Sequence, residues 1–342
     1  MASTIGMVIP AHNAEWFLDQ ALASVAWQSR PVQQVVLVDD GSTDGTAERA
    51  SRWTDVLPLR VVRSPRRGGI GHARRLGIEH LDTDLVLQLD ADDLLLPHHV
   101  RAMAQAHERH PGLISPRPLL WDGAGDWRAA TYYKNRLPAP GDQLAQLLLL
   151  NYVVVGAMFD RRRYQEVGGY RGCAFSEDWD LWLRLVAAGE RVTKLETATY
   201  VYRRHPGSFS VGVNRQHVQT VVLENFLADC AEGRYRRIAK LSMLQRLGAR
   251  YLDRLPPVRA PEQVLAVLGV AADRLAAVGH DPELGLVLHE AAADRVSVVD
   301  LGPAEELRLV LHGRELPDGF QVDYVHDESL RLRWSSLLEA AS

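Results

Sequence analysis

The sequence has 342 residues, of which 46% are hydrophobic and 24% are charged, and its formal net charge is −4. This balance excludes a general electrostatic attraction to nucleic acid or to anionic membranes, and the length predicts one large domain with a smaller addition. The two cysteines, Cys173 and Cys230, are too few for a disulfide framework. The apolar stretches are too short to span a bilayer and the N-terminus lacks a signal-peptide pattern, so we expect a cytoplasmic protein without a transmembrane segment.

Apolar runs and helical patterns alternate through residues 5–109. The apolar runs predict buried strands at Ile5–Ile9, Val35–Val38, Leu59–Val62 and Leu85–Leu89. Capping residues and helical spacing predict helices that begin near Asn13, at Asp44 after a cap by Ser42 or Thr43, at Gly71 and at Pro97. This alternation is typical of a mostly parallel α/β sheet with helices on both faces.

The rest of the chain is less regular. Residues 143–150 and 180–188 are expected to be helical, and residues 153–159 and 200–204 to be strands. From residue 216 the composition becomes rich in Leu, Ala and Arg with helical periodicity at 219–230, 235–247 and 261–277, whereas residues 307–334 hold possible strands around the turn at Pro317–Gly319. We therefore predict a catalytic domain at 1–215 and a mainly helical region at 216–342, which serves acceptor binding or oligomerisation, for example as a homodimer.

Polar clusters directly follow three of the apolar runs. They are Pro10–Asn13, Asp39–Thr46 and Asp90–Asp93. In an open parallel sheet, ligands bind beyond the carboxyl ends of the strands. Carboxylates grouped there repel one another unless a cation or hydrogen-bond donors compensate. Helix capping explains Ser42 or Thr43, but it does not explain Asp39 and Asp40 together.

The segment Asp90-Ala91-Asp92 places two carboxylates on the same side of an extended chain. Hard oxygen ligands of this kind suit Mg²⁺ or Mn²⁺, and Mg²⁺ is usually held by one or two carboxylates together with substrate phosphates. An isolated Asp-x-Asp is common in loops, so its position at the end of the fourth strand is what favours a metal site.

Six ordered segments resemble the inverting glycosyltransferases of family 2, which have the GT-A fold. They are Ile9–Asn13, Val38–Asp44, Gly69–Ile78, Leu89–Asp93, Ser176–Arg184 and Tyr202–Ser208. The resemblance covers roughly residues 4–212 and implies a GT-A sheet flanked by helices that binds a nucleotide-sugar.

The resemblance also implies a role for individual residues. Asp40 would accept a hydrogen bond from the base, and the backbone of Pro10, Ala11, His12 and Asn13 would line the nucleoside. Arg74, with Gly69 at the start of its segment, would lie near the pyrophosphate or the Asp-x-Asp loop. Asp90, beside Ala91, would contact the ribose or the metal. Asp92 would be the principal metal ligand and His205 a second metal or diphosphate contact.

By the same resemblance, Asp178 would be the catalytic base. Inverting transfer needs a base to take the proton of the acceptor hydroxyl, together with neutralisation of the departing diphosphate. The alternative for Glu177 and Asp178 is a helix N-terminus that favours acidic residues, and both interpretations can hold together. Trp179 and Trp182 would either stack on a sugar or belong to the core.

The chain departs from the family pattern in two places. Arginines replace the usual asparagines at Arg67 and Arg75 and, with Arg66 and Arg74, form a basic segment that is either solvated or contacts an acidic group. The Gln-x-x-Arg-Trp signature of processive enzymes is absent after Asp178, so we expect a single transfer rather than polymer synthesis.

The donor and two other functions stay open from the sequence. UDP-sugar is the first expectation because the family most often uses it, with GDP- or dTDP-sugars as alternatives, and the acceptor is unknown. A nucleotidyltransferase would carry a Gly-rich basic signature after the first strand, where this chain has Pro10–Asn13. A non-catalytic partner protein that binds nucleotide-sugars would not need Asp90, Asp92 and Asp178.

Overall fold

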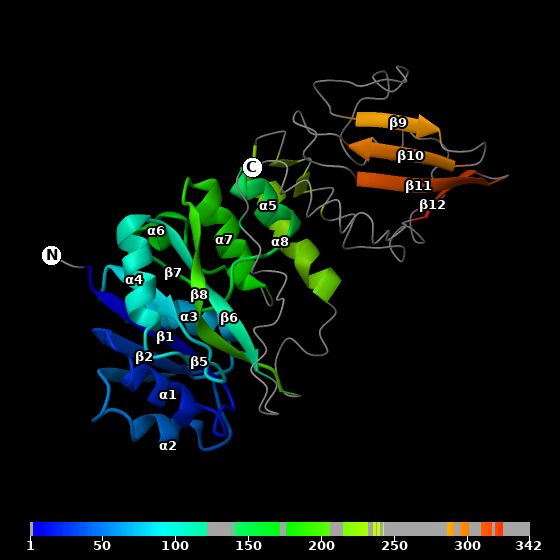
Figure 1. Ribbon diagram of the computed structural model, residues 1–342. Helices are drawn as coiled ribbons and strands as arrows, with labels where there is room; N and C mark the ends of the chain where they lie inside the picture. Colours follow the sequence, from blue (N-terminus) through cyan, green and yellow to red (C-terminus); the bar gives the residue numbers. More distant parts are fainter. Residues whose placement is uncertain are drawn as a thin grey trace. The chain divides into compact units, whose positions relative to one another are not determined.

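A computed structural model describes most of the N-terminal two thirds of the chain and parts of the remainder. The described residues are 3–121, 138, 141–171, 176–205, 215–231, 235–236, 238–239, 242, 286–290, 295–300, 309–316 and 319–323. The chain divides into two compact units, one of residues 1–138 and 150–226, the other of residues 139–149 and 227–342. Figure 1 labels the helices and strands of each unit.

The first unit contains an eight-stranded mixed sheet with the order β3-β2-β1-β4-β7-β6-β8-β5 (Figure 1). Its strands are β1 Ile5–Ala11, β2 Gln34–Asp39, β3 Leu59–Arg63, β4 Leu85–Gln88, β5 Leu94–Leu95, β6 Leu113–Trp121, β7 Met158–Asp160 and β8 Val192–Arg203. The first four strands pair in parallel, and β7 joins β4 in antiparallel orientation. The fold class predicted from the alternating pattern, a mostly parallel α/β sheet with flanking helices, is confirmed for this unit.

The helices of the first unit follow the predicted order. They are α1 Leu18–Ala26, α2 Thr46–Ser51, α3 Ile70–Glu79, α4 His99–Arg109, α6 Arg161–Glu166 and α7 Glu177–Ala187. Two predicted starts are wrong. Asn13 has a left-handed φ of 50° and precedes a turn, so α1 begins only at Leu18. Neither Ser42 nor Thr43 caps α2, because the Asp44 carboxylate accepts the backbone N–H of Thr46 instead.

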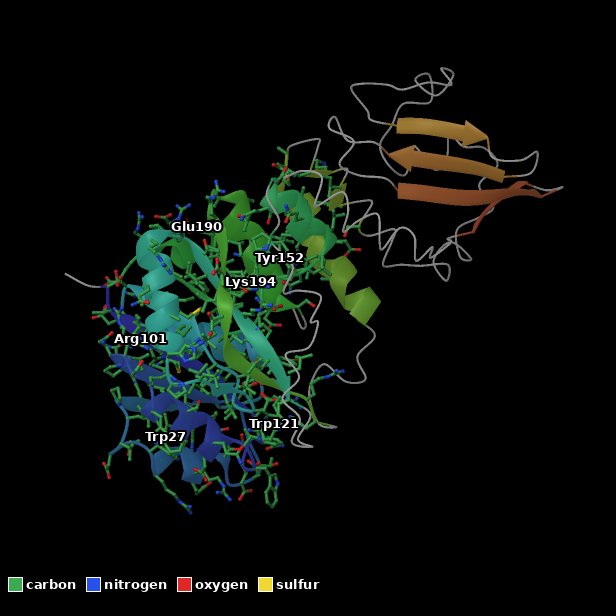
Figure 2. All side chains as sticks on the ribbon, viewed as in Figure 1. Trp27, Arg101, Trp121, Tyr152, Glu190 and Lys194 are labelled. Atoms are coloured by element: carbon green, nitrogen blue, oxygen red, sulfur yellow. The ribbon has the colours of Figure 1, made fainter. Side chains whose placement is uncertain are left out.

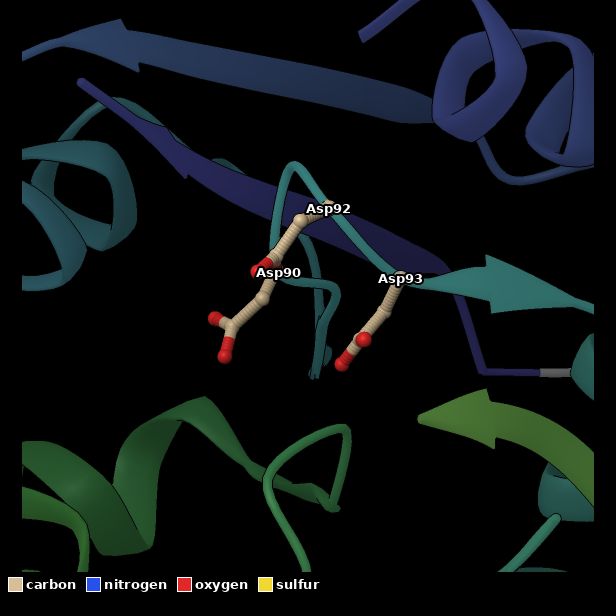
Figure 3. A group of neighbouring side chains, drawn as sticks. All are labelled: Asp90, Asp92 and Asp93. Atoms are coloured by element: carbon tan, nitrogen blue, oxygen red, sulfur yellow. The ribbon is translucent and has the colours of Figure 1, made fainter. Parts of the chain in front are cut away.

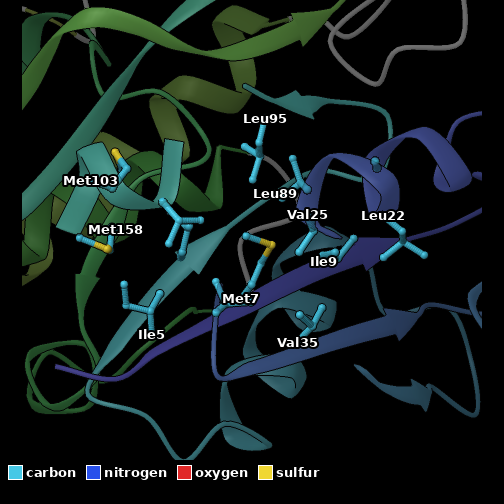
Figure 4. Packing of buried hydrophobic residues seen from close by; sticks show 14 of the residues in the cluster. Ile5, Met7, Ile9, Leu22, Val25, Val35, Leu89, Leu95, Met103 and Met158 are labelled. Carbon is cyan, nitrogen blue, oxygen red and sulfur yellow. The ribbon is translucent and has the colours of Figure 1, made fainter. Parts of the chain in front are cut away.

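Buried aliphatic side chains join the sheet to its helices. Figure 4 shows Met7 and Ile9 of β1 beside Leu22 and Val25 of α1 within one fully packed cluster. On α3 the helix approaches the sheet so closely that a Cβ at Gly77 would lie 2.5 Å from Cγ1 of Val8. This packing fixes the carboxyl ends of β1, β2 and β4 as one rigid edge.

The second unit contains α5 Gln143–Leu149 and a four-stranded antiparallel sheet of order β12-β11-β10-β9. Its strands are β9 Leu286–Glu290, β10 Arg295–Asp300, β11 Leu309–Leu316 and β12 Gly319–Asp323. Strands β11 and β12 pair antiparallel, and residues 317 and 318 of the predicted turn lie outside the described residues. Strands β9 and β10 were not predicted, because short Val and Leu runs were overlooked in a region expected to be mainly helical. Of the predicted helices, α8 Arg215–Asp229 is present, whereas 261–277 lies outside the described residues; the boundary at residue 215 stays a prediction.

Candidate active site

The polar clusters predicted at the strand ends meet at one edge of the sheet, because β1, β2 and β4 run in parallel. The loops after β1 and β2 are joined through Asn13, whose backbone N–H donates to Oγ of Ser42 (3.0 Å) and whose Oδ1 accepts the N–H of Thr43 (2.9 Å). His12 belongs to the same junction, with Nδ1 3.0 Å from the carbonyl oxygen of Asp40. Thus the Pro10–Asn13 segment has a fixed backbone.

Asp40 is buried and supports the neighbouring glycine loop. Its two carboxylate oxygens accept the backbone N–H groups of Gly68 at 2.8 Å and of Gly69 at 2.7 Å. Gly69 has a φ of 87°, a conformation that few other residues adopt. Sequence reasoning missed this loop-supporting role, for which no motif exists; a carboxylate has further lone pairs, so contact with a base remains a prediction.

The three aspartates after β4 lie together, with one oxygen of each within 4.8 Å of the others (Figure 3). Asp93 is already engaged, since it accepts hydrogen bonds from Oη of Tyr200 at 2.6 Å and from the backbone of Arg203 at 2.8 Å. Burial and the neighbouring carboxylates raise the pKa of Asp93 well above its usual value. Asp93 therefore anchors the loop to β8, and Asp90 and Asp92 are left to face a ligand.

His205 comes to this cluster from a distant part of the sequence. Its Nε2 lies 3.0 Å from Oδ2 of Asp92, and its ring centroid lies 4.5 Å from that of Phe17. An imidazole nitrogen beside carboxylate oxygens is a donor set that suits a divalent cation. The structure thus places Asp90 and Asp92 in one cluster and brings His205 to Asp92.

Arg203 holds the end of β8 next to the start of α1. Its guanidinium carbon lies 4.9 Å from the ring centroid of Phe17 and 4.7 Å from that of Trp121, which is labelled in Figure 2. Nη2 also donates to Oε1 of Gln20 at 2.6 Å. Sequence reasoning missed these two cation–π contacts, and through Phe17 they connect Arg203 with the ring of His205.

Arg74 is 1% exposed and connects two acidic segments. Nη2 donates to Oδ1 of Asp90 at 2.7 Å, and Nη1 donates to Oε1 of Glu177. Burial lowers the pKa of Arg74, but the charges of Asp90 and Glu177 outweigh that effect and raise it. Of the four arginines in the basic segment, Arg74 alone is buried, whereas Arg66, Arg67 and Arg75 are exposed, so both interpretations stay open for these three.

Asp178 lies in the first turn of α7, directly after Glu177. Its Oδ1 accepts the backbone N–H of Trp179 at 2.7 Å, and Nδ2 of Asn151 lies 3.3 Å from Oδ2. Both acids are buried. Burial raises the pKa of Glu177 to about 7, with Arg74 opposing and Asp178 adding to the shift. Asn151 was not predicted, because a single Asn in an irregular stretch carries no signal.

The two tryptophans of α7 are core residues. Trp179 and Trp182 are fully buried, and the ring of Trp182 packs edge-on against Phe159 at 5.6 Å. The sugar-stacking alternative is therefore wrong for both.

Among the helices that the structure describes, none is long and apolar enough to cross a bilayer.

The fold is of the GT-A glycosyltransferase type. The Staphylococcus aureus TarS fragment 1–349 in complex with UDP-GlcNAc superimposes with a TM-score of 0.60 at 18% identity over 77% of this chain and 83% of that one. The mannosyltransferase PcManGT from Pyrobaculum calidifontis, solved with GDP-Man and Mn²⁺, gives a TM-score of 0.54 at 19% identity over 81% of each chain.

Sequence comparison identifies the family within this class. Residues 7–168 match the family described as Glycosyl transferase family 2. The amylovoran biosynthesis glycosyltransferase AmsE of Erwinia amylovora is 28% identical over 52% of this chain and 67% of its own length. The putative glycosyltransferase EpsE of Bacillus subtilis is 26% identical over 60% and 74%. Residues 7–168 therefore form a glycosyl transferase family 2 domain, as the motifs in this range predicted, and the chain is an enzyme.

Proposed function

We propose that this glycosyltransferase moves one sugar from a nucleotide-sugar to an acceptor hydroxyl or other nucleophile, with inversion and with the help of Mn²⁺ or Mg²⁺. The observation that carries the proposal is the convergence of Asp90, Asp92 and Asp93 within 4.8 Å, with Nε2 of His205 3.0 Å from Asp92. UDP-sugar is the first donor to test and GDP- or dTDP-sugar the next. The complexes of TarS with UDP-GlcNAc and of PcManGT with GDP-Man and Mn²⁺ support this choice.

The residues present fit a divalent cation. Asp92 would hold it together with Asp90 and His205, whereas the two hydrogen bonds that Asp93 accepts reserve that carboxylate for the loop. When bound, the cation would neutralise the charge that develops on the departing diphosphate. The carboxylate-rich edge of the sheet, with Arg74 as its buried cation, supports this role.

The chain itself would supply the base and the donor pocket. Asp178 takes the proton of the attacking hydroxyl, and Asn151 orients its carboxylate. The backbone of residues 10–13 and Ala91 lines the nucleoside. Asp40 accepts a hydrogen bond from the nucleobase of the donor. The same carboxylate holds Gly68 and Gly69 in the conformation that admits the diphosphate.

Two substitutions separate metal binding from proton transfer. Asp92→Ala is expected to abolish calorimetric binding of Mn²⁺ with UDP and hydrolysis of UDP-GlcNAc or GDP-mannose. Asp178→Asn should bind Mn²⁺ and UDP normally while its hydrolysis rate falls by about 100-fold or more, since a positioned base contributes on the order of 10²–10⁴. The β-sugar should be released first from the α-linked UDP-GlcNAc, as seen by NMR.

Asp82→Ala is the matched control, because the Asp82 side chain is 94% exposed and remote from the strand-end cluster. It should leave binding and hydrolysis unchanged. Hydrolysis that continues at the wild-type rate in both Asp92→Ala and Asp178→Asn would refute the proposed function. Initial release of the α-sugar would refute inversion.

A further inference from the structure

One buried guanidinium spans the two halves of the proposed reaction. Arg74 on α3 contacts Asp90 in the loop that follows β4, and it also contacts Glu177, the residue before Asp178 on α7. Asp90, on the proposed metal side, and Glu177, next to the proposed base, therefore share Arg74 as a hydrogen-bond partner. A two-armed guanidinium fixes both carboxylates in a plane, which a lysine ammonium would not do.

The backbone around the Arg74–Glu177 contact allows the two side chains to approach closely. A Cβ at Gly71 would lie 3.0 Å from Cγ and 3.2 Å from Cβ of Glu177, so the missing side chain lets Glu177 approach α3. Gly71 lies one turn before Arg74, on the face that meets the start of α7. Ser176, just before Glu177, has a left-handed φ of 53°, an unfavourable conformation for a residue other than glycine. Such strain persists where the surroundings impose a particular geometry.

Carboxylates outnumber the guanidinium of Arg74 at this contact. Asp90 and Glu177 both bond to Arg74, and Asp178 adds a third carboxylate beside it. Without Arg74 the two acidic segments would repel each other in a site shielded from water. The separation between the metal side and the base therefore depends on this one residue.

We propose that Arg74 and Glu177 form a positioning pair that sets the place of the base Asp178 relative to the metal-side residue Asp90. This inference rests on the proposed function and adds a coupling between its two sides. Neither residue touches a reacting atom: Arg74 acts through Asp90 and Glu177, and Glu177 acts through the first turn of α7. Breaking the Glu177 arm should misplace the base and leave donor binding intact.

Glu177→Leu removes this arm without touching Asp90 or Asp178. We expect kcat for UDP-GlcNAc hydrolysis to fall by about 10–100-fold, which is the usual cost of losing a residue that orients a ligand or base. The calorimetric Kd for Mn²⁺ with UDP should stay within about twofold of the wild type. Glu177→Gln keeps an oxygen that accepts from Nη1 of Arg74 and should recover most of the lost rate. Arg74→Lys should weaken both rate and binding.

Two further variants protect the result against misfolding. Gly71→Ala retains every charge but pushes Glu177 away, so it should lower kcat with an unchanged Kd even if Glu177→Leu does not fold. Arg184→Lys alters a buried ion pair near the other end of α7. It should lower the melting temperature without changing kcat at about 25 °C, where the variant is still folded.

The possible outcomes separate the two proposals. Equal kcat in Glu177→Leu and Arg184→Lys, or a Glu177→Gln variant as slow as Glu177→Leu, would overturn the positioning role and leave the proposed function in place. A wild-type protein that neither binds Mn²⁺ with UDP or GDP nor hydrolyses either sugar donor would overturn the proposed function and the positioning role with it.

Discussion

The two ends of helix α7 each meet a buried arginine, and the two arginines are used differently. Near the last turn, Arg184 donates through Nε and Nη2 to Asp180, and through Nη1 and Nη2 to the carbonyl oxygens of Val167 and Gly169. At the first turn, Arg74 reaches Asp90 and Glu177. Its Nε is buried without a hydrogen-bond partner among the residues that the structure describes.

Charge balance separates the two ends further. Arg184 pairs closely with one carboxylate, that of Asp180, at 2.7 Å. Arg74 serves two carboxylates directly and lies near Asp178. A pair made for stability satisfies its donors and balances its charge, so the carboxylate excess at Arg74 supports the proposed cation at this edge of the sheet.

The largest stability effect is expected at the balanced end. Arg184→Met removes the close partner of the buried Asp180 carboxylate and leaves only Arg171, at 3.9 Å, among its described ion-pair partners. It should lower the free energy of unfolding by about 3 kcal/mol, measured by urea denaturation. Arg74→Met should cost less, because Glu177, with its pKa raised to about 7, can take up a proton when its partner is lost. The double variant Arg184→Met with Asp180→Leu should regain most of the loss. Equal costs for the two arginines would erase the distinction.

The pH dependence of stability is the next largest effect and belongs to the Arg74 end. Burial raises the pKa of Glu177 from 4.5 to about 7, so the folded state holds this proton over a range where the unfolded state has lost it. Stability should therefore fall as pH rises from 4.5 to 7, by on the order of 3 kcal/mol from this group. Urea denaturation across this range, in the presence of EDTA, should show a weaker decline for Glu177→Gln than for the wild type.

Asp84 provides a control of opposite sign. The backbone and hydroxyl of Thr4 donate to its carboxylate and lower its pKa. The stability it contributes is present above its unfolded pKa and is lost as pH falls through its lowered value. Asp84→Asn should remove that loss at acidic pH, whereas Glu177→Gln acts between pH 4.5 and 7. Identical pH profiles for Glu177→Gln and the wild type would contradict the raised pKa.

The edge of the sheet at the carboxyl ends of β1, β2 and β4 was the more predictable part of the fold and site. Apolar runs such as Ile5–Ile9 and Leu85–Leu89 are local signals, and parallel pairing brings the polar residues that follow them to one edge without further information. The motifs therefore placed Asp92 and His205 in one site although they are 113 residues apart. The family and the GT-A fold followed from the order of those motifs.

The partners of the site residues were not predictable, because they depend on long-range packing. Nothing in the sequence pairs Arg74 with Glu177, Asp40 with the glycine loop, or Arg203 with two aromatic rings. Trp179 and Trp182 could have been surface or core, and only the tertiary position of α7 decides this. The strands β9 and β10 were overlooked because their short Val and Leu runs lie in a stretch of helical composition.

The smallest expected effect concerns how the backbone is shaped at each end of α7. Near Arg184, the left-handed positions are glycines, Gly168 with φ 80° and Gly169 with φ 63°, whereas the position beside Glu177 is Ser176 with φ 53°. Ser176→Gly should relieve about 1–2 kcal/mol of left-handed strain and lose about 0.5–1 kcal/mol to the added freedom of the unfolded chain. The net gain, about 0.5–1 kcal/mol, should be visible in urea denaturation.

Asn13 offers the matched control, because it is the other left-handed residue besides glycines in the part of the chain that the structure describes. Asparagine tolerates this conformation, and Oδ1 of Asn13 also accepts the N–H of Thr43 at 2.9 Å. Asn13→Gly should therefore lose about 1 kcal/mol, the net value of one hydrogen bond, instead of gaining stability. If Ser176→Gly were also destabilising, the left-handed turn before Glu177 would be relaxed, and the Arg74 end of α7 would be as unstrained as the Arg184 end.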